Sequence, residues 1–313
     1  AIIIPSLEAM KARDADIPKA RIFDWTDETG YTGAFQQACA QLELADFLLG
    51  VEALHMRVLE LELLQRYAPG VSIAHAEPVM GTLRMRKDEE ELNTMRRAIE
   101  VAEKAMRRMM PRIKIGMTEK QIAAMLTQFL MEGGADTVPF GPIVSAGPNS
   151  ASPHAVPTDR PLQTGDLLVI DWGAYVDGYP SDITRTFAVG ELDAELVRVY
   201  HAVKQANERG RQAARPGATG RDVDRAARGV ITNAGYGNYF IHRTGHGLGL
   251  EVHEPPFMME DNTDPLETGM VFTVEPGIYL PGRGGVRIED DVVVTADGHT
   301  CLTSFPRDLI TVG

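Results

Sequence analysis

Four acidic residues and one histidine stand in or beside apolar, strand-like runs of this 313-residue chain. They are Asp171, Asp182, His246, Glu275 and Glu289. A charged side chain in such surroundings must be paired or must bind a metal, because an isolated buried carboxylate is very costly. Four carboxylates and a single histidine cannot neutralise one another. We therefore expect divalent cations, two of them, to convert the repulsion into attraction.

The donor types indicate which metal and which chemistry. Oxygen-rich ligation with one imidazole suits harder metals such as Mn²⁺, with Co²⁺ or Zn²⁺ as alternatives. Two metals roughly 3.5–4 Å apart are an established way to hold a bridging hydroxide at neutral pH and to polarise a carbonyl. Hydrolysis is therefore the expected reaction.

Each residue taken alone also has an ordinary structural explanation. Asp171 or Asp182 could cap a turn, and Glu289 could pair with Arg287 on a strand edge. His246 could lie in a tight loop between its two flanking glycines. The complete set, more than any member of it, favours a metal site.

The elements that would carry these residues are repeated along the chain. The segments that begin at Gly116 and Gly217 each offer a Thr N-cap with a polar partner three residues later. Residues 164–175 align with residues 268–279 through Thr-Gly, a later Gly and a Tyr, and each run carries one of the candidate carboxylates. We infer two α/β halves whose acids converge on a pseudo-twofold axis. Chance similarity of two apolar strands is the alternative.

The domain boundary is expected just before a long helix. Residues 88–91 open this helix with acids at its positive end, and apolar residues then recur at helical spacing. The preceding part mixes short apolar runs with an amphipathic helix at residues 52–67. We expect an N-terminal α/β domain at residues 1–83 and a second domain at 84–313. The first domain is expected to be partial, because the chain begins without Met in what resembles the end of a strand.

Composition limits the partners and the compartment. Acids outnumber Lys and Arg by 44 to 31, and the net charge of −13 would repel nucleic acid or an anionic membrane surface. The apolar runs fall far short of the ~20 residues that a membrane helix needs, and we find no signal peptide. Cys39 and Cys301 are too few for a disulfide framework or a Cys-rich zinc site. We expect a cytoplasmic protein.

Three motifs surround the candidate residues. They are Gly-His-Gly-Leu-Gly-Leu-Glu-Val-His-Glu at 245–254, Val-Glu-Pro-Gly-Ile-Tyr at 274–279 and Val-Arg-Ile-Glu-Asp at 286–290. Together with the five candidates in this order, they resemble the pita-bread metallopeptidases, and within them the Xaa-Pro peptidases aminopeptidase P and prolidase. The resemblance covers about residues 84–313, while residues 1–83 are similar to the latter part of that family's N-terminal domain. It implies an α+β fold with a duplicated, pseudo-twofold pita-bread catalytic domain.

The resemblance also implies roles for the candidates. Two metal ions are expected, usually Mn²⁺ or Co²⁺. Asp171 would chelate one ion, Asp182 and Glu289 would bridge both, and His246 and Glu275 would complete the other. Glu275 would also carry the proton from the bridging water to the leaving proline nitrogen.

Further residues are assigned around the metals by the same resemblance. His154, His242 and His253 have the spacing of the family's substrate-side histidines, which donate hydrogen bonds to the scissile carbonyl and the oxyanion. Arg287 would orient carboxylates, with a purely structural role as the alternative. Four aromatic residues are candidates for a proline pocket, although core packing explains each of them better: Phe140, Trp172, Tyr175 and Phe257.

The expected function is a dinuclear metal-dependent exopeptidase that cleaves the Xaa-Pro bond at the N-terminus of peptides. This bond is a tertiary amide without an N–H, so it needs a dedicated pocket. The alternatives are a methionine aminopeptidase, a creatinase-type C–N hydrolase or a non-catalytic binding protein of the same fold. The presence of all five candidate ligands disfavours the metal-free and non-catalytic alternatives. The resemblance further implies a homodimer.

Substrate length depends on a cation. A strict dipeptidase must hold the free carboxylate of proline, best with a bidentate Arg. Some prolidases place a basic residue shortly after the second histidine of the motif, but residues 253–260 contain none. Arg283 and Arg287 are the remaining nearby candidates. The sequence therefore slightly favours an aminopeptidase that accepts tripeptides and longer chains.

Overall fold

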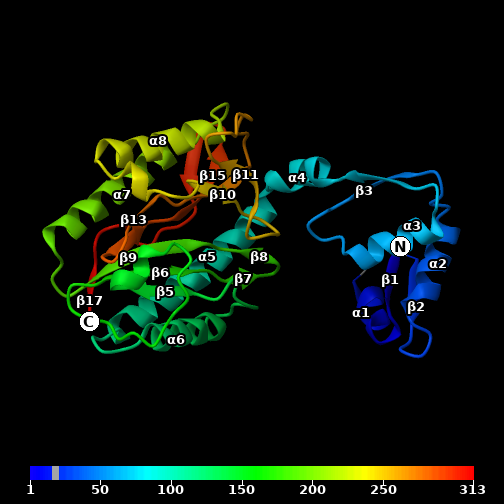
Figure 1. Cartoon of the computed structure of the whole chain (residues 1–313), viewed down its shortest axis with the longest axis horizontal. Helices are drawn as coiled ribbons and strands as arrows, with labels where there is room; N and C mark the ends of the chain where they lie inside the picture. The colour runs from blue at the N-terminus through cyan, green and yellow to red at the C-terminus, as the bar shows by residue number, and fades with distance from the viewer. Residues whose placement is uncertain (16–20) are drawn as a thin grey trace. The chain divides into compact units, whose positions relative to one another are not determined.

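The computed structural model describes residues 1–15 and 21–313, and within them the chain forms two compact units. The units are Ala1–Thr82 and Leu83–Gly313, and Figure 1 draws both with the labels used below. Among the described residues, none of the helices combines the length and the apolar character needed to cross a membrane.

The first unit is built from short parallel strand pairs and the helices beside them. Its elements are β1 (Ile2–Pro5), α1 (Ala9–Asp14), β2 (Ile22–Trp25), α2 (Tyr31–Gln41), β3 (Leu48–Val51), α3 (Val58–Tyr67), β4 (Ser72–His75) and α4 (Glu77–Met85), the last of which crosses the boundary. β1 pairs in parallel with β2, and β3 with β4. Ala34 and Ala38 of α2 pack against Phe23 of β2. The short apolar runs of the sequence therefore form strands covered by helices.

The helix expected at residues 52–67 is shorter than predicted, because α3 begins only after the first turn of that stretch. There the N–H of Met56 donates to the carbonyl of Glu52 at 2.8 Å and closes a separate turn. The side chain of Glu60 then accepts from the N–H of Arg57 at 3.0 Å and caps the helix start. Apolar residues continue through the turn, so hydrophobic spacing alone did not locate the boundary.

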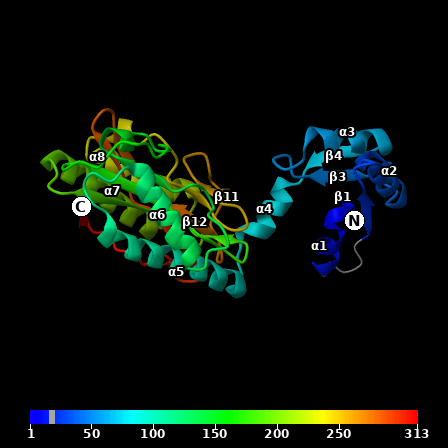
Figure 2. The ribbon, with the colours of Figure 1, turned by 90° about the horizontal axis from the view of Figure 1, so that it is seen from below.

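The second unit combines two larger sheets and two short strand pairs with two helix pairs. Its elements are α5 (Glu89–Met109), α6 (Glu119–Glu132), β5 (Ile143–Ala146), β6 (Leu167–Trp172), β7 (Tyr175–Val176), β8 (Tyr179–Pro180), β9 (Ile183–Val189), α7 (Ala194–Ala213), α8 (Gly220–Asn233), β10 (Gly245–Gly247), β11 (Glu254–Met258), β12 (Val271–Val274), β13 (Gly277–Leu280), β14 (Gly284–Arg287), β15 (Asp290–Thr295), β16 (Gly298–Cys301) and β17 (Thr311–Val312). The larger sheets have the orders β17-β9-β6-β5 and β11-β10-β12-β15-β16, and β7 pairs with β8 and β13 with β14. Within this unit, α5 and α6 lie on one side of the strands and α7 and α8 on the other (Figures 1 and 2).

The internal duplication is confirmed by contacts that recur in both halves. Thr118 caps α6 and Thr219 caps α8, each with a complete capping box. The N–H of Gly116 donates to the carbonyl of Leu162 at 3.0 Å, and in the second half Gly217 donates to Leu266 at 2.9 Å. The repeated sequence pattern therefore corresponds to a repeated arrangement of helix and strand.

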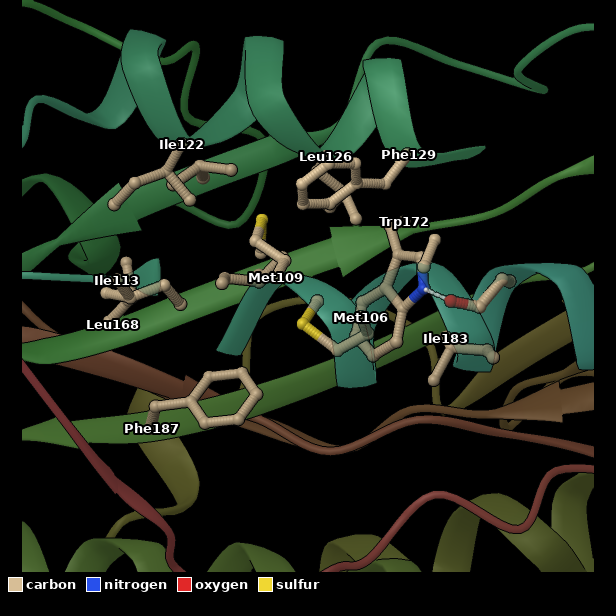
Figure 3. Packing of buried hydrophobic residues seen from close by; sticks show 14 of the residues in the cluster. Met106, Met109, Ile113, Ile122, Leu126, Phe129, Leu168, Trp172, Ile183 and Phe187 are labelled. Atoms are coloured by element: carbon tan, nitrogen blue, oxygen red, sulfur yellow. Dashed lines mark hydrogen bonds between the residues drawn. The ribbon is translucent and has the colours of Figure 1, made fainter. Parts of the chain in front are cut away.

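The core of the first half lies between α5, α6 and the four-stranded sheet. Figure 3 shows Leu126 of α6 beside Trp172 of β6, and Met109 of α5 between Ile122 of α6 and Phe187 of β9. The Trp172 side chain is fully buried, and its indole N–H donates to the carbonyl of Ala102 at 2.9 Å. Trp172 is therefore a core residue, as the sequence favoured. Asp171 directly precedes Trp172 near the end of β6, so packing of the core fixes the strand that carries this acid.

Candidate metal centre

A cavity of about 640 Å³ in the second unit brings together the predicted metal ligands, the three predicted substrate-side histidines and Arg287. The predicted residues that line it are His154, Asp171, Asp182, His242, His246, His253, Glu275, Arg287 and Glu289. They span 136 positions of the chain, from 154 to 289. Folding therefore converts a dispersed set of polar residues into one cluster.

The four-stranded sheet positions the first two acids. Asp171 lies near the end of β6, and Asp182 directly precedes β9. The two strands pair antiparallel with Asp171 opposite Thr184. The short β7–β8 hairpin joins them, so the chain reverses and returns Asp182 to the same edge of the sheet.

The five-stranded sheet positions the other three candidates. His246 is the central residue of β10, Glu275 directly follows β12 and Glu289 directly precedes β15. Val274 pairs with Asp290 across β12 and β15, which places Glu275 and Glu289 at neighbouring strand ends. Each half of the duplication thus contributes carboxylates from strand ends.

The distances within the cluster suit metal ligation. His246 Nε2 lies 3.6 Å from Asp182 Oδ2 and 3.6 Å from Glu275 Oε1. Ligand atoms of Asp182, His246 and Glu289 all lie within 4.8 Å of one another. Within the described residues, Asp171 Oδ1 and Asp182 Oδ1 are buried without a hydrogen-bond partner. Buried carboxylate oxygens of this kind require a cation, so the donor set fits divalent metal ions.

Electrostatics support the same interpretation. Burial and the neighbouring carboxylates raise the pKa values of Asp182 and Glu289 well above the ordinary range. Burial also raises the pKa of Glu275 to about 7. Burial, together with the nearby His253, lowers the pKa of His246 to about 3. The imidazole is therefore neutral, and Nδ1 lies 3.1 Å from the carbonyl oxygen of Gly247, so that Nε2 is directed at the acids.

Arg287 links the acids to the cavity wall. Its guanidinium donates to Asp171 Oδ2 at 2.7 Å and to the hydroxyl of Tyr279 at 2.9 Å. It also donates to Thr184 Oγ1 at 3.1 Å, and this hydroxyl donates to Glu289 Oε2 at 2.6 Å. Burial opposes its charge, but Tyr279, Asp171 and Glu289 raise the pKa of Arg287 well above its usual value. Arg287 therefore stays charged and orients two of the candidate ligands.

The three histidines differ in how they face the cavity. Both ring nitrogens of His242 have protein partners, the carbonyl of Arg243 at 2.7 Å and the hydroxyl of Tyr279 at 2.9 Å. Burial lowers the pKa of His242 to about 4, so it is neutral. The ring of His253 lies 4.2 Å from the ring of His246, and burial lowers its pKa as well. His154 is exposed at the cavity wall.

One cationic residue of the cavity, Arg243, was missed by sequence reasoning. Arg243 lines the cavity, and its guanidinium carbon lies 4.7 Å from the centre of the Phe257 ring. By contrast, Arg283 is an exposed residue that pairs with Asp193 at 3.4 Å and with Glu195. The sequence signal that could have identified Arg243 was its position, since it directly follows His242 and precedes His246 by three residues.

The four aromatic candidates for the proline pocket lie in different places in the structure. Phe140 lines the cavity, whereas Trp172 is in the core and Phe257 lies beneath Arg243. The hydroxyl of Tyr175 donates to the carbonyl of Leu250 at 3.5 Å. Phe140 therefore remains the candidate for an apolar contact with substrate.

Comparison with known proteins gives concordant matches. Residues 93–296 match the model of metallopeptidase family M24. The chain is 42% identical over 234 residues to the Xaa-Pro dipeptidase of Pyrococcus furiosus, covering 75% of this chain and 67% of that protein. It resembles the solved structure of a prolidase from Thermococcus sibiricus, with TM-score 0.93 and 37% identity over 99% of this chain and 83% of that one. It also resembles an X-Pro aminopeptidase from Thermotoga maritima, with TM-score 0.87 and 35% identity over 99% and 86%.

Proposed function

The chain belongs to metallopeptidase family M24 and has the predicted pita-bread fold, and from that premise we propose that it hydrolyses the Xaa-Pro bond at the N-terminus of short peptides. The observation that carries the proposal is the convergence of four carboxylates and a neutral histidine in one cavity beside further neutral histidines. Xaa-Pro peptidases among its relatives support this substrate.

We propose that two divalent ions are held by the five candidates identified above. The proposed ligands are Asp171, Asp182, His246, Glu275 and Glu289. When bound, the ions would polarise the scissile carbonyl and make the attacking water more acidic. The oxygen-rich donor set supports Mn²⁺, with Co²⁺ or Zn²⁺ as alternatives. A homodimer and a cytoplasmic location stay predictions from the sequence.

The chain's own residues would bind and orient the substrate. Burial lowers the pKa of His253, which is therefore a neutral donor at the cavity wall, and His154 lies at the same wall. Both side chains are suited to the scissile carbonyl oxygen and to the oxyanion that forms from it. Glu275 would take the proton from the attacking water and pass it to the leaving proline nitrogen. The chain of hydrogen bonds from Arg287 through Tyr279 to His242 would hold the wall between them rigid.

Arg243 supports a preference for dipeptides. Among the residues that the structure describes, no carboxylate forms an ion pair with it, although four carboxylates line the same cavity. The sequence argument for longer substrates rested on the absence of such a cation near the motif. Stacked on Phe257, the guanidinium is held in place and can offer a bidentate site to a carboxylate. We therefore propose that Arg243 binds the free carboxylate of an Xaa-Pro dipeptide.

A peptide panel tests the function and the substrate length together. Chelated enzyme is reloaded with Mn²⁺, Co²⁺ or Zn²⁺ and assayed on an Xaa-Pro dipeptide, its C-terminal amide and the same dipeptide extended by two residues. We expect metal-dependent cleavage and a higher kcat/KM for the free dipeptide. Failure to cleave any Xaa-Pro bond with any of these metals would refute the proposed function.

Variants of Arg243 isolate the carboxylate contact. Arg243→Leu should lower kcat/KM for the free dipeptide by roughly 10- to 100-fold, the equivalent of a lost charged hydrogen bond, and leave the amide nearly unchanged. Arg283→Leu is the matched control, because Arg283 is paired on the surface. Equal losses on the dipeptide and its amide would contradict a role in carboxylate binding.

A further inference from the structure

A buried ion pair lies beside the cavity, outside the residues assigned to metal or substrate. Lys87 Nζ donates to Glu254 Oε1 at 2.6 Å, and their side chains are only 1% and 6% exposed. Burial lowers the pKa of Lys87, an effect that the carboxylate of Glu254 partly offsets. A buried ion pair is often no more stabilising than apolar residues of the same volume. Stability alone therefore does not explain why these two charges are buried.

The backbone of Lys87 is fixed to the sheet that carries Glu275. Its N–H donates to the carbonyl of Gly269 at 2.8 Å, and the preceding Arg86 pairs with Met270 in an antiparallel bridge. Met270 directly precedes β12, the strand that Glu275 directly follows. The ammonium group of Lys87 is thus held by a rigid part of the second unit.

The other partner, Glu254, organises the segment that carries His253. Glu254 Oε2 accepts from the N–H of Glu251 at 3.3 Å, and the carbonyl of Glu251 accepts from the N–H of Gly249 at 3.1 Å. Gly249 lies directly against the ion pair, because a Cβ there would be 2.7 Å from Lys87 Nζ and would clash with Glu254 Oε1. Residues 249–254 therefore fold closely around the Glu254 carboxylate.

His253 directly precedes Glu254, and its ring contacts His246. A displacement of Glu254 would therefore move the His253 imidazole relative to the candidate metal ligands. We propose that Lys87 is a positioning residue that, through Glu254, holds His253 at the cavity wall in the geometry needed for catalysis. This inference rests on the proposed role of His253 in binding substrate.

The first test is kinetic. Lys87→Met keeps the length of the side chain and removes its charge. We expect kcat on an Xaa-Pro dipeptide to fall roughly 10- to 100-fold, since a displacement of about 1 Å can have an effect of that size, while KM and metal content stay near wild type. Lys104→Met removes one partner of an exposed ion pair with Glu100 and serves as the control, with unchanged kinetics.

A double-mutant cycle shows whether Lys87 acts through His253. In a His253→Ala background, Lys87→Met should lower kcat by less than 2-fold, because the group that it positions is already missing. If Lys87→Met lowers kcat by the same factor in both backgrounds, the proposal is wrong.

A third variant separates positioning from stability. Lys87→Met leaves Glu254 buried without its partner and can destabilise the protein, whereas Lys87→Met/Glu254→Leu replaces both charges with apolar groups. We expect the double variant to recover most of the wild-type Tm and to retain the low kcat. Recovery of kcat together with Tm would mean that the ion pair only stabilises the fold, and would overturn the proposal.

Histidine NMR provides a readout that does not depend on activity. The ¹³Cε1–¹H signal of His253, identified by its loss in His253→Ala, should shift in Lys87→Met and stay in place in Lys104→Met. An unshifted signal in Lys87→Met would contradict positioning, even if the wild-type protein cleaved none of the peptides tested. That last result would refute the proposed function and not this inference.

Discussion

Three of the five candidate ligands have an identifiable neighbour that sets their orientation. Arg287 binds one oxygen of Asp171, and the other is buried without a hydrogen-bond partner among the described residues. Thr184 binds one oxygen of Glu289, and the carbonyl of Gly247 orients the ring of His246. Such neighbours typically change metal affinity by about 10–100-fold. Substitutions of these orienting neighbours should therefore change metal affinity measurably, as substitutions of the ligands would.

We predict two divalent ions per chain after reconstitution of the metal-free protein with Mn²⁺. Asp182→Asn should retain fewer than one, because this carboxylate faces both His246 and the other acids. Metal content is measured by elemental analysis after gel filtration, with Glu132→Gln, an exposed acid paired with Arg108, as the control. Wild-type protein that keeps less than one equivalent, with activity insensitive to chelators, would rule out this centre.

A second prediction concerns the histidines assigned to substrate. His253→Ala and His154→Ala should each lower kcat by ~10²–10³-fold, the usual effect of losing a donor to an oxyanion. Metal content should remain near that of wild type, because neither side chain is assigned to the ions. Kinetics and elemental analysis on the same preparations check both expectations. Release of metal by either variant would show that the division between metal-binding and substrate-binding histidines is incorrect.

At the level of elements, the duplication gives α6 and α8 equivalent N-caps and equivalent backbone contacts. α6 and α8 both begin after a Thr N-cap. Each of these threonines forms an antiparallel bridge with a proline of its own half, Thr118 with Pro161 and Thr219 with Pro265. The strand ends that follow deliver Asp171 in one half and Glu275 in the other. Two copies of one α/β unit therefore supply both sides of the centre.

The two caps provide a matched pair of stability predictions. Thr118 Oγ1 accepts from Gln121 N at 3.2 Å, and Thr219 Oγ1 accepts from Asp222 N at 3.1 Å. Thr118→Ala and Thr219→Ala should each lower the free energy of unfolding by about 1 kcal/mol, with kcat unchanged. Urea denaturation measures the effect. Thr94→Ala, at a half-buried position within α5, is the control and should have a smaller effect. A difference of several kcal/mol between the two caps would contradict their equivalence.

At the scale of the catalytic unit, Asp290 joins segments that are distant in the chain. The carboxylate, fully buried, accepts from Arg185 of β9 at 2.8 Å and from Arg307 near the C-terminus at 2.6 Å. Arg211 of α7 lies 3.5 Å away. One side chain thus links the first-half sheet, a second-half helix and the final segment, directly beside Glu289.

Replacement of this carboxylate should strongly destabilise the unit. Asp290→Asn leaves Arg185 buried without its charge partner, so we expect the free energy of unfolding at pH 7 to fall by about 3–5 kcal/mol. Burial alone would raise the pKa of Asp290, but Arg185 and Arg307 lower it well below the ordinary range. Its contribution is therefore fully present above the unfolded value of about 3.9 and decreases as the pH falls below it.

Urea denaturation of metal-free protein between pH 7 and pH 3 measures this dependence. The difference between wild type and Asp290→Asn should shrink as the pH falls below about 4. Asp308→Asn is the control, because its ion pair with Lys204 is exposed and should contribute little. A constant difference across this range would indicate that the loss does not come from the charge of Asp290.

The amino-acid sequence by itself predicted the family, the fold class and the duplication, because short segments of the chain indicate each of these features. Strand-like runs ending in an acid, Thr N-caps and the motif around His246 each lie within a dozen residues. Local spacing was a poorer guide to helix boundaries, as α3 shows, because apolar periodicity continued through a preceding turn.

The sequence predicted that the candidate ligands converge, but only the tertiary structure revealed the particular side-chain contacts that support them. Lys87 and Glu254 are 167 positions apart, and Arg287 reaches Asp171 across 116. Neither pair leaves a periodic or spaced signal in the sequence. Arg243 was likewise visible as a residue, but its place over Phe257 and in the cavity depends on how β10 and β11 pair. Contacts of this kind arise from the packing of whole elements, and a pattern confined to one element does not encode them.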